Sequence, residues 1–137
     1  MNIRTVCLAT LLAFASPLVA IAGDKEESAR QAALAWLTLV DTKQYAQSWD
    51  ATALLFRGQV NRADWVKAVA AARKPFGDLI SRKLISATYA TSLPGAPDGE
   101  YVVLQFATVF TNKAQAVETI TPMLDEGRWR VSGYFVR

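Results

Sequence analysis

Apolar residues in the first half of the chain recur at the spacing of amphipathic helices. In residues 24–40 an apolar side chain returns every three or four positions, and Asp24 and Glu27 occupy the positions of a capping box. Residues 45–58 repeat aromatic and apolar side chains about every four positions and predict a second, shorter helix. Residues 61–74 predict a third helix, because an asparagine stands at its N-cap and a proline follows it.

The second half of the chain alternates apolar and polar residues, a pattern typical of strands. Segments rich in β-branched and aromatic residues lie at residues 79–91, 100–111, 114–123 and 128–136. The last three are joined by links too short for a crossover, so neighbouring strands must run antiparallel. We therefore predict an α+β fold, with three N-terminal helices packed on a curved four-stranded antiparallel sheet, in a single domain of residues 23–137.

Turn lengths predict which face of each strand meets the helices. We expect a two-residue link at Asn112 and Lys113, and a three-residue turn that ends at Gly127 with positive φ. The residues then expected to face the helices are Val102, Leu104, Phe106, Phe110, Val117, Thr119, Met123, Trp129, Val131 and Phe135. The opposite face, which a second copy of the chain would partly cover as a homodimer, carries Tyr101, Val103, Gln105, Val109, Glu118, Ile120, Arg130, Ser132 and Tyr134. A one-residue slip would exchange part of this assignment.

The stretch TSLPGAPDGEYVVLQF places a Gly/Pro cluster directly before a strand. A phosphate-binding loop needs consecutive backbone N–H donors and a helix after them, whereas here two prolines remove donors and a strand follows. Residues 93–99 are therefore predicted to connect two strands.

Residues 1–22 have the order of a secretory signal peptide, with a basic start, a short apolar run and an Ala-Ile-Ala cleavage pattern. The run is too short to span a bilayer, and Cys7 lies inside it instead of at its end. We therefore expect a periplasmic or secreted protein that begins near Gly23 and keeps no membrane or lipid anchor.

Composition removes several classes of function. The formal net charge of +3 comes from interspersed charges without a long basic run, so no nucleic-acid partner is expected. The chain has no histidine, and its single cysteine lies in the predicted signal peptide. A Ser-His-Asp triad, a Cys-His pair and the usual zinc ligands are thereby excluded, and we expect no metal and no cofactor.

Carboxylates, lysines and tyrosines remain as candidates for proton transfer. The predicted register places Glu118 across from Tyr134, with Arg130 nearby. Glu118 is then either a base or ligand-binding carboxylate, or one member of a surface cross-strand pair, which is the interpretation that we favour. Asp41 is a second candidate base, although its place after the first helix is also that of a turn former.

Three further side chains near the predicted helices have both a functional and a structural interpretation. Tyr45 and Trp49 lie one helical turn apart and either line a pocket or belong to the core, which is the commoner role of such a pair. Arg73 either binds an anion or compensates the dipole at the end of the third helix.

Several segments together resemble a family of small secreted bacterial proteins catalogued as domain of unknown function four-zero-one-nine. They are AWLTLVDTKQYAQSWD, Trp65 with the later ARKPFG, SLPGAPDGEYVVLQF, VETIT and GRWRVSGYF. This resemblance covers nearly all of the chain after residue 22 and implies no activity. The order of helices and strands is also similar to the nuclear-transport-factor-two-like, or cystatin-like, architecture, in which a curved sheet and helices form a cone.

Two functions follow from these observations. The first, which we prefer, is a non-enzymatic module that binds a protein, a peptide or a small apolar ligand through the sheet face or a cavity between sheet and helices. The alternative is a small enzyme with a carboxylate base in a cone-shaped pocket, which requires Glu118 or Asp41 to be buried beside an aromatic hydroxyl.

Overall fold

A computed structural model describes residues 23–137 of the chain, and the predicted signal peptide lies outside the described residues. Helices come first and strands follow, as the sequence predicts. The elements are α1 (Asp24–Asp41), α2 (Tyr45–Asp50), α3 (Leu54–Arg57), α4 (Arg62–Arg73), the 3-10 turn η1 (Lys74–Phe76), β1 (Leu79–Ala90), β2 (Tyr101–Phe110), β3 (Lys113–Asp125) and β4 (Arg128–Val136). Within this described range, no helix is long and apolar enough to cross a membrane.

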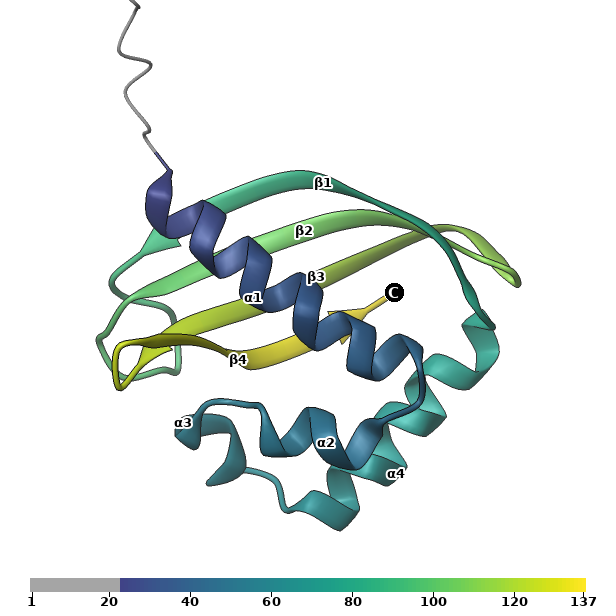
Figure 1. Cartoon of the computed structure of the whole chain (residues 1–137), viewed down its shortest axis with the longest axis horizontal. Helices are drawn as coiled ribbons and strands as arrows, with labels where there is room; N and C mark the ends of the chain where they lie inside the picture. Colours follow the sequence, from purple (N-terminus) through teal and green to yellow (C-terminus); the bar gives the residue numbers. More distant parts are fainter. Residues whose placement is uncertain (1–22) are drawn as a thin grey trace, which may run out of the picture.

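The four strands form one antiparallel sheet in the order β1-β2-β3-β4. The sheet is curved, and α1 runs obliquely across one of its faces, while α2, α3 and α4 gather below α1 near β4 (Figure 1). The predicted α+β class is therefore confirmed.

α1 forms because its apolar residues make one continuous stripe, which packs on the sheet. The buried members of this stripe are Ala29, Ala33, Trp36, Leu37 and Val40. The predicted capping box is wrong: Asp24 is already the first helical residue after the N-cap Gly23, and no side chain caps the helix. The carboxylate of Glu27 is instead held by Arg30, one turn further along, at 2.6 and 2.9 Å.

The predicted second helix is divided into α2 and α3. The hydroxyl of Thr52 donates a 2.6 Å hydrogen bond to the Trp49 carbonyl, and the Ala53 amide donates to the Val131 carbonyl of β4 at 2.9 Å. This second bond ties the chain to the sheet and prevents one continuous helix. The third predicted helix is confirmed as α4, and the Asn61 side chain caps it by accepting from the Asp64 amide at 2.8 Å.

The predicted register between β2 and β3 is wrong by one residue. Phe110 pairs with Lys113, so the two residues that link β2 to β3 are Thr111 and Asn112. The pairing then shifts by one residue between Phe110 and Thr108. Glu118 therefore stands opposite Phe106 and shares its face. Since a one-residue slip reverses every side chain of a strand, the β3 residues that turn to the helices are Ala116, Glu118 and Ile120 in place of Val117, Thr119 and Met123.

The last hairpin also differs from the prediction. Asp125 pairs with Arg128, so the turn has two residues, Glu126 and Gly127, both with positive φ, and the positive φ predicted for Gly127 is confirmed. A further register shift in the β3–β4 pairing lies between Ile120 and Pro122, and it changes which β4 side chains face the helices near the end of the strand. Tyr134 consequently packs inward against the core, whereas Phe135, predicted to face the helices, is 61% exposed.

Most other strand predictions agree with the structure. Residues 91–100 connect β1 to β2, and within this link the Gly99 amide donates to the Thr91 carbonyl at 3.1 Å. On β2 the residues predicted to face the helices are all buried: Val102, Leu104, Phe106 and Phe110. Thr108, which was not predicted, is buried too, and so is Tyr101, which was predicted for the opposite face. Two tryptophans fix the helices over this core, because Trp36 donates to the Ser48 carbonyl and Trp65 to the Ser48 hydroxyl.

Candidate functional site

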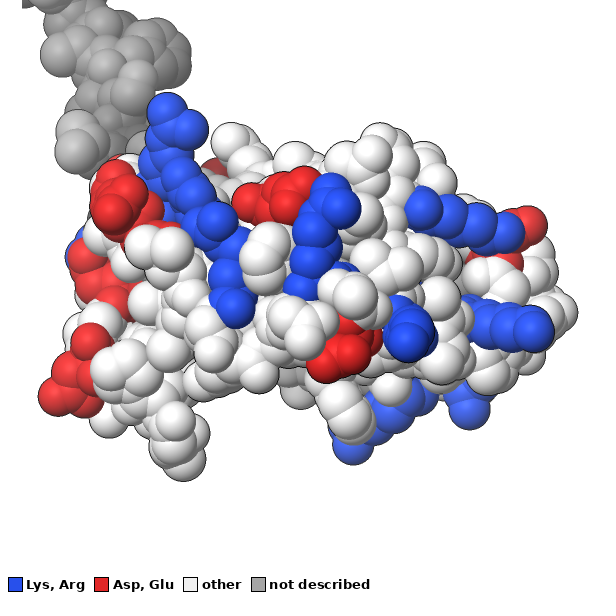
Figure 2. Space-filling model, turned by 90° about the horizontal axis from the view of Figure 1, so that it is seen from below, with Lys and Arg blue, Asp and Glu red and all other residues white. Residues whose placement is uncertain are grey.

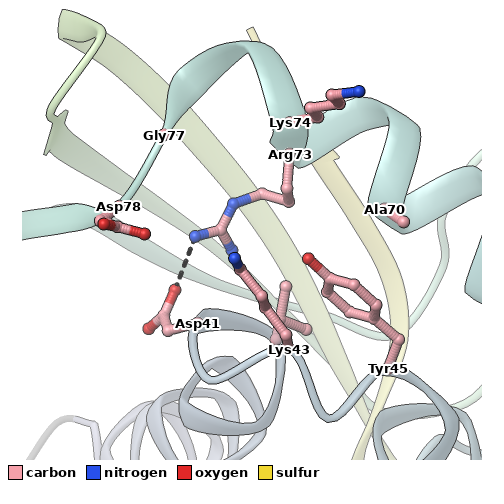
Figure 3. A pocket seen from close by; sticks show the side chains of 9 residues that line it. Asp41, Lys43, Tyr45, Ala70, Arg73, Lys74, Gly77 and Asp78 are labelled. Carbon is pink, nitrogen blue, oxygen red and sulfur yellow. Dashed lines mark hydrogen bonds and ion pairs between the residues drawn. The ribbon is translucent and has the colours of Figure 1, made fainter.

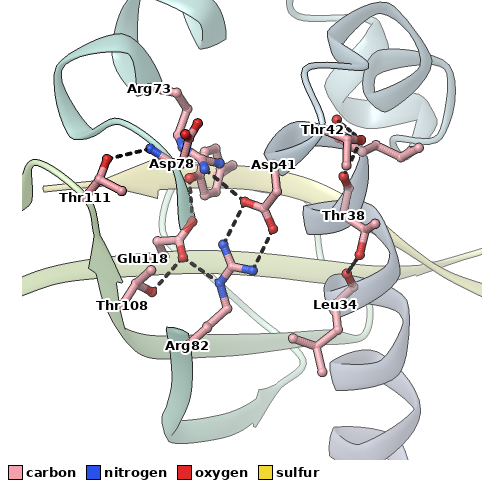
Figure 4. A network of polar contacts seen from close by, with 12 residues as sticks. Leu34, Thr38, Asp41, Thr42, Arg73, Asp78, Arg82, Thr108, Thr111 and Glu118 are labelled. Atoms are coloured by element: carbon pink, nitrogen blue, oxygen red, sulfur yellow. Dashed lines mark hydrogen bonds and ion pairs between the residues drawn. The ribbon is translucent and has the colours of Figure 1, made fainter. Parts of the chain in front are cut away.

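A network of charged side chains is buried between α1, α4 and the sheet (Figure 4). At its base, Glu118 has no exposed surface and accepts three hydrogen bonds. Oε1 accepts from Arg82 Nε at 2.7 Å and from the Thr108 hydroxyl at 2.6 Å, and Oε2 accepts from the Tyr134 hydroxyl at 2.6 Å. The carboxylate is thus compensated by one cation and two hydroxyl donors, as a buried charge requires.

Arg82 carries the network from the sheet to the helices. Its Nη1 and Nη2 donate to the two oxygens of Asp41, at 2.9 and 3.0 Å, in the paired geometry that favours arginine. Asp41 is the last residue of α1, and its Oδ1 also accepts from Nη2 of Arg73 at 2.9 Å. The chain Glu118, Arg82, Asp41, Arg73 alternates in sign and carries no net charge, so the attraction between neighbours offsets much of the cost of burial.

The network shifts the pKa of two of its members. Burial lowers the pKa of Arg82, but the hydrogen bonds and charges of Asp41 and Glu118 outweigh this and hold the pKa above its ordinary value. Burial, and then the negative charge of Glu118, raise the pKa of Tyr134 far above its ordinary value. Tyr134 therefore remains a protonated donor, and Arg82 remains a cation.

A cleft of about 320 Å³ lies beside this network, where the α1–α2 link, the end of α4 and the η1–β1 link meet. Its polar lining consists of Asp41, Lys43, Tyr45, Arg73, Lys74 and Asp78 (Figure 3). Arg73 reaches from α4 into the space between Asp41 and Tyr45. The floor of the cleft is therefore the outer end of the buried network.

Arg73 is unusually placed for a guanidinium. Its side chain is only 5% exposed, and its guanidinium carbon lies 4.7 Å from the centre of the Phe110 ring. Nη2 donates to Asp41, whereas Nε and Nη1 find no hydrogen-bond acceptor among residues 23–137. Because arginine has only donors, these two nitrogens are satisfied only if something else supplies acceptors.

Gly77 fixes the wall of the cleft against the β2–β3 hairpin. Its φ is 77°, and a Cβ atom here would collide with the Thr111 hydroxyl. This close approach lets the Thr111 hydroxyl accept from the backbone N–H of Asp78 at 2.9 Å. The backbone N–H of Asn112 donates to the Phe76 carbonyl, also at 2.9 Å. The end of α4 and the start of β1 are thus held in one position relative to the β2–β3 hairpin.

The structure brings together some of the predicted candidates and separates others. Glu118 and Tyr134 meet as predicted, although the cross-strand neighbours of Glu118 are Phe106 and Val136. The interpretation of Glu118 as part of a surface pair is wrong, because the side chain is fully buried. Arg130 is not near it and instead stands opposite Met123.

The two candidate residues of α2, Tyr45 and Trp49, have different surroundings. Tyr45 lines the cleft with Asp41 and Arg73, and it also packs against the core, as the commoner role of such a pair predicts. Trp49 lies among the helices, packs against the core and donates its indole N–H to the Val60 carbonyl at 2.8 Å. Arg82, the central residue of the network, was not among the sequence candidates. The sequence did contain one indication of its role. Side chains two positions apart in a strand point to the same face, and Arg82 lies two positions before Leu84, which packs against the core.

Comparison with known protein families gives a match over most of the chain. The chain belongs to the family described as "Protein of unknown function (DUF4019)", which matches residues 32–134. The match includes every residue of the charge network. Comparison with curated proteins gives no match.

Proposed function

We propose that the protein is a non-enzymatic binding module that holds a small polar ligand in the cleft between α1, α4 and β1. The observation that carries this proposal is the buried guanidinium of Arg73, which lines the cleft and has two nitrogens without acceptors. A buried donor without a partner costs free energy, and a ligand that supplies acceptors recovers it on binding, once the atoms that cover these nitrogens move aside. The scaffold that holds this cleft is, in our proposal, of the cone-shaped nuclear-transport-factor-two-like kind.

The carboxylate oxygens of Glu118 and Asp41 already accept hydrogen bonds from the protein, which favours binding over catalysis. A catalytic base must reach the proton that it removes, but Glu118 is fully buried and both its oxygens already accept hydrogen bonds. Asp41 lines the cleft, yet its oxygens accept three hydrogen bonds from two guanidinium groups. Both carboxylates therefore serve to hold the arginines in place.

The polar lining narrows the kind of ligand. Five of the six polar side chains at the cleft bear a formal charge, and the sixth is the phenol of Tyr45. A polar molecule fits this lining better than the small apolar ligand expected from the sequence. Pockets that bind small molecules occupy roughly 300–1,000 Å³, so a cleft of about 320 Å³ suits a small metabolite.

A variant in which a large side chain fills the cleft tests whether ligands bind there. Ala70 lines the cleft, and the exposed Ala71 beside it on α4 does not. A library of small polar metabolites is screened by amide-resonance shifts of the ¹⁵N-labelled protein. We expect hits to shift resonances of the cleft, and to bind Ala71→Trp like wild type but fail to bind Ala70→Trp. The proposal is wrong if no compound shifts cleft resonances, or if Ala70→Trp binds the same hits as well as wild type does.

We also propose that the protein works outside the cytoplasm, after removal of residues 1–22. This proposal rests on the sequence pattern alone. Mass spectrometry of the protein isolated from a bacterial expression host should find an N-terminus near Gly23, and an intact Met1 terminus would contradict it.

A further inference from the structure

We infer that the ligand of the cleft carries an oxyanion, a carboxylate or phosphate group, which is bound by Arg73 with Lys43 and Lys74 on either side. This inference rests on the proposed binding function and adds the chemical class of the ligand.

The buried hydrogen-bonding groups of the cleft that lack a partner within residues 23–137 are donors, whereas the exposed Asp78 carboxylate supplies acceptors. Nε and Nη1 of Arg73 have no acceptor among the described residues, and a guanidinium has no acceptor of its own. Figure 3 shows the Tyr45 hydroxyl turned toward Arg73, where it can add a further donor. Carboxylates and phosphates are the acceptors that match arginine best, because several oxygens can take its N–H groups together.

The charge of the cleft favours an anion. Lys43, Arg73 and Lys74 contribute three positive charges, against two negative charges from Asp41 and Asp78. Asp41 is moreover shared with the buried Arg82. The C-terminal ends of α1 and α4 add roughly half a negative charge each and offset this excess, so the preference for an anion comes from the placement of the exposed lysines Lys43 and Lys74.

Charged side chains are unevenly distributed along the molecule. In Figure 2, acidic side chains gather toward the left end, and basic side chains dominate the right half. The ends of α1 and α4 lie on this right side (Figure 1). A basic surface around a recessed site raises the local concentration of anions and the rate at which they bind.

Arg73 is held rigidly enough to act as a receptor. Asp41 fixes one nitrogen, and the Phe110 ring lies 4.7 Å from the guanidinium carbon. Asp41 is itself held by two bonds from Arg82, which is anchored on Glu118. Because the guanidinium is ordered before the ligand arrives, little conformational entropy is lost on binding.

Inorganic phosphate and succinate serve as probes, each titrated into the folded protein at constant ionic strength and followed by amide-resonance shifts. We expect at least one of them to shift the resonances of Lys43, Tyr45 and Lys74. Lys43→Gln and Lys74→Gln remove exposed charges without touching the network, and each should weaken binding about fivefold, the effect of roughly 1 kcal/mol for one nearby charge. Lys67→Gln, an exposed lysine of α4 outside the cleft, is the matched control and should bind like wild type.

The possible results separate this inference from the proposed function. If phosphate alone binds, the ligand carries a phosphate group, and if succinate alone binds, it carries a carboxylate. Equal weakening by Lys67→Gln and Lys74→Gln would mean diffuse attraction, and would overturn the inference. It is also overturned if neither probe shifts the cleft while neutral compounds from the metabolite screen do, a result that leaves the binding function intact.

Discussion

Ile120 and Glu118 lie two positions apart on β3, face the same helices and are both fully buried, yet their surroundings are opposite in kind. Ile120 belongs to the apolar cluster formed by α1 and the sheet, together with Leu104 and Trp36. Glu118 belongs to the charge network that extends through Arg82 to the cleft. One layer of the fold thus holds an apolar region and an ionic region side by side.

The difference shows how stability and geometry are divided in this domain. Apolar burial is favourable for almost any packing of the right volume. A buried ion pair is weak evidence for stability, because removing its charges from water costs nearly as much as their attraction returns. What the ionic region supplies is a fixed position for Arg73 at the cleft, held through Asp41, Arg82 and Glu118.

The largest effect is expected where the ionic region loses its buried anion. Glu118→Gln keeps the shape of the side chain but leaves Arg82 with an uncompensated buried charge on that side. We expect a loss of about 3–5 kcal/mol in the free energy of unfolding. Urea denaturation followed by tryptophan fluorescence measures it. A change below about 1 kcal/mol would mean that the Glu118 charge is not buried in solution.

A slightly smaller effect is expected in the apolar region. Ile120→Ala removes buried methyl and methylene groups and leaves a cavity, at a cost of about 2–5 kcal/mol. The cleft should be unaffected, because Ile120 is no part of the network. A variant that loses this stability but binds the phosphate or succinate probe like wild type supports the division of roles. Weakened probe binding in the folded Ile120→Ala variant would contradict it.

Removal of a single donor from the ionic region should have an intermediate effect. Tyr134→Phe leaves Oε2 of Glu118 without its 2.6 Å hydrogen bond. Hydrogen bonds to charged groups contribute about 1.5–3 kcal/mol, and we expect a destabilisation of that size in urea denaturation at pH 7. Tyr45→Phe, which changes the same group at the cleft, is the matched control and should cost clearly less. Equal losses in the two variants would count against the special role of Tyr134.

The sequence predicts the apolar region better than the ionic region, for a physical reason. Periodicity reports which residues avoid water, and it therefore predicted α1, α4 and the buried residues of β2. It failed on β3, because the register there depends on a bulge next to Phe110 and on the contact of Thr111 with the η1–β1 link. The turn lengths expected from the sequence placed Glu118 on the outer face, although alternation within its own strand groups it with Ala116 and Ile120.

The ionic region depends on contacts that are distant in sequence. Arg82 and Glu118 come from different strands, and Asp41 and Arg73 from the ends of different helices. Each has a sufficient local explanation in the sequence, as a surface charge, a turn former or a helix-terminal cation. Only the assembled fold shows that the four charges satisfy one another and that Arg73 retains free donors.

The smallest effect, and the most specific, concerns pH. Burial and the charge of Glu118 raise the pKa of Tyr134 in the folded protein above its ordinary value of about 10. Below pH 10 the phenol is protonated in both the folded and the unfolded chain, so its contribution to stability is complete. Above pH 10 the unfolded chain releases this proton while the folded protein retains it, and the free energy of unfolding falls by up to about 1.4 kcal/mol per pH unit.

Tyr134→Phe removes this contribution and leaves the other titrating groups in place. The difference in unfolding free energy between wild type and Tyr134→Phe, measured by urea denaturation from pH 8 to pH 11.5, should be constant up to about pH 10 and should shrink above it. The absorbance of tyrosinate gives an independent measure, since wild type should gain more of it on unfolding at pH 11 than the variant does. A difference that stays constant across the whole range would show that the Tyr134 phenol ionises as easily in the folded protein as in the unfolded chain, and that Glu118 does not lie charged beside it.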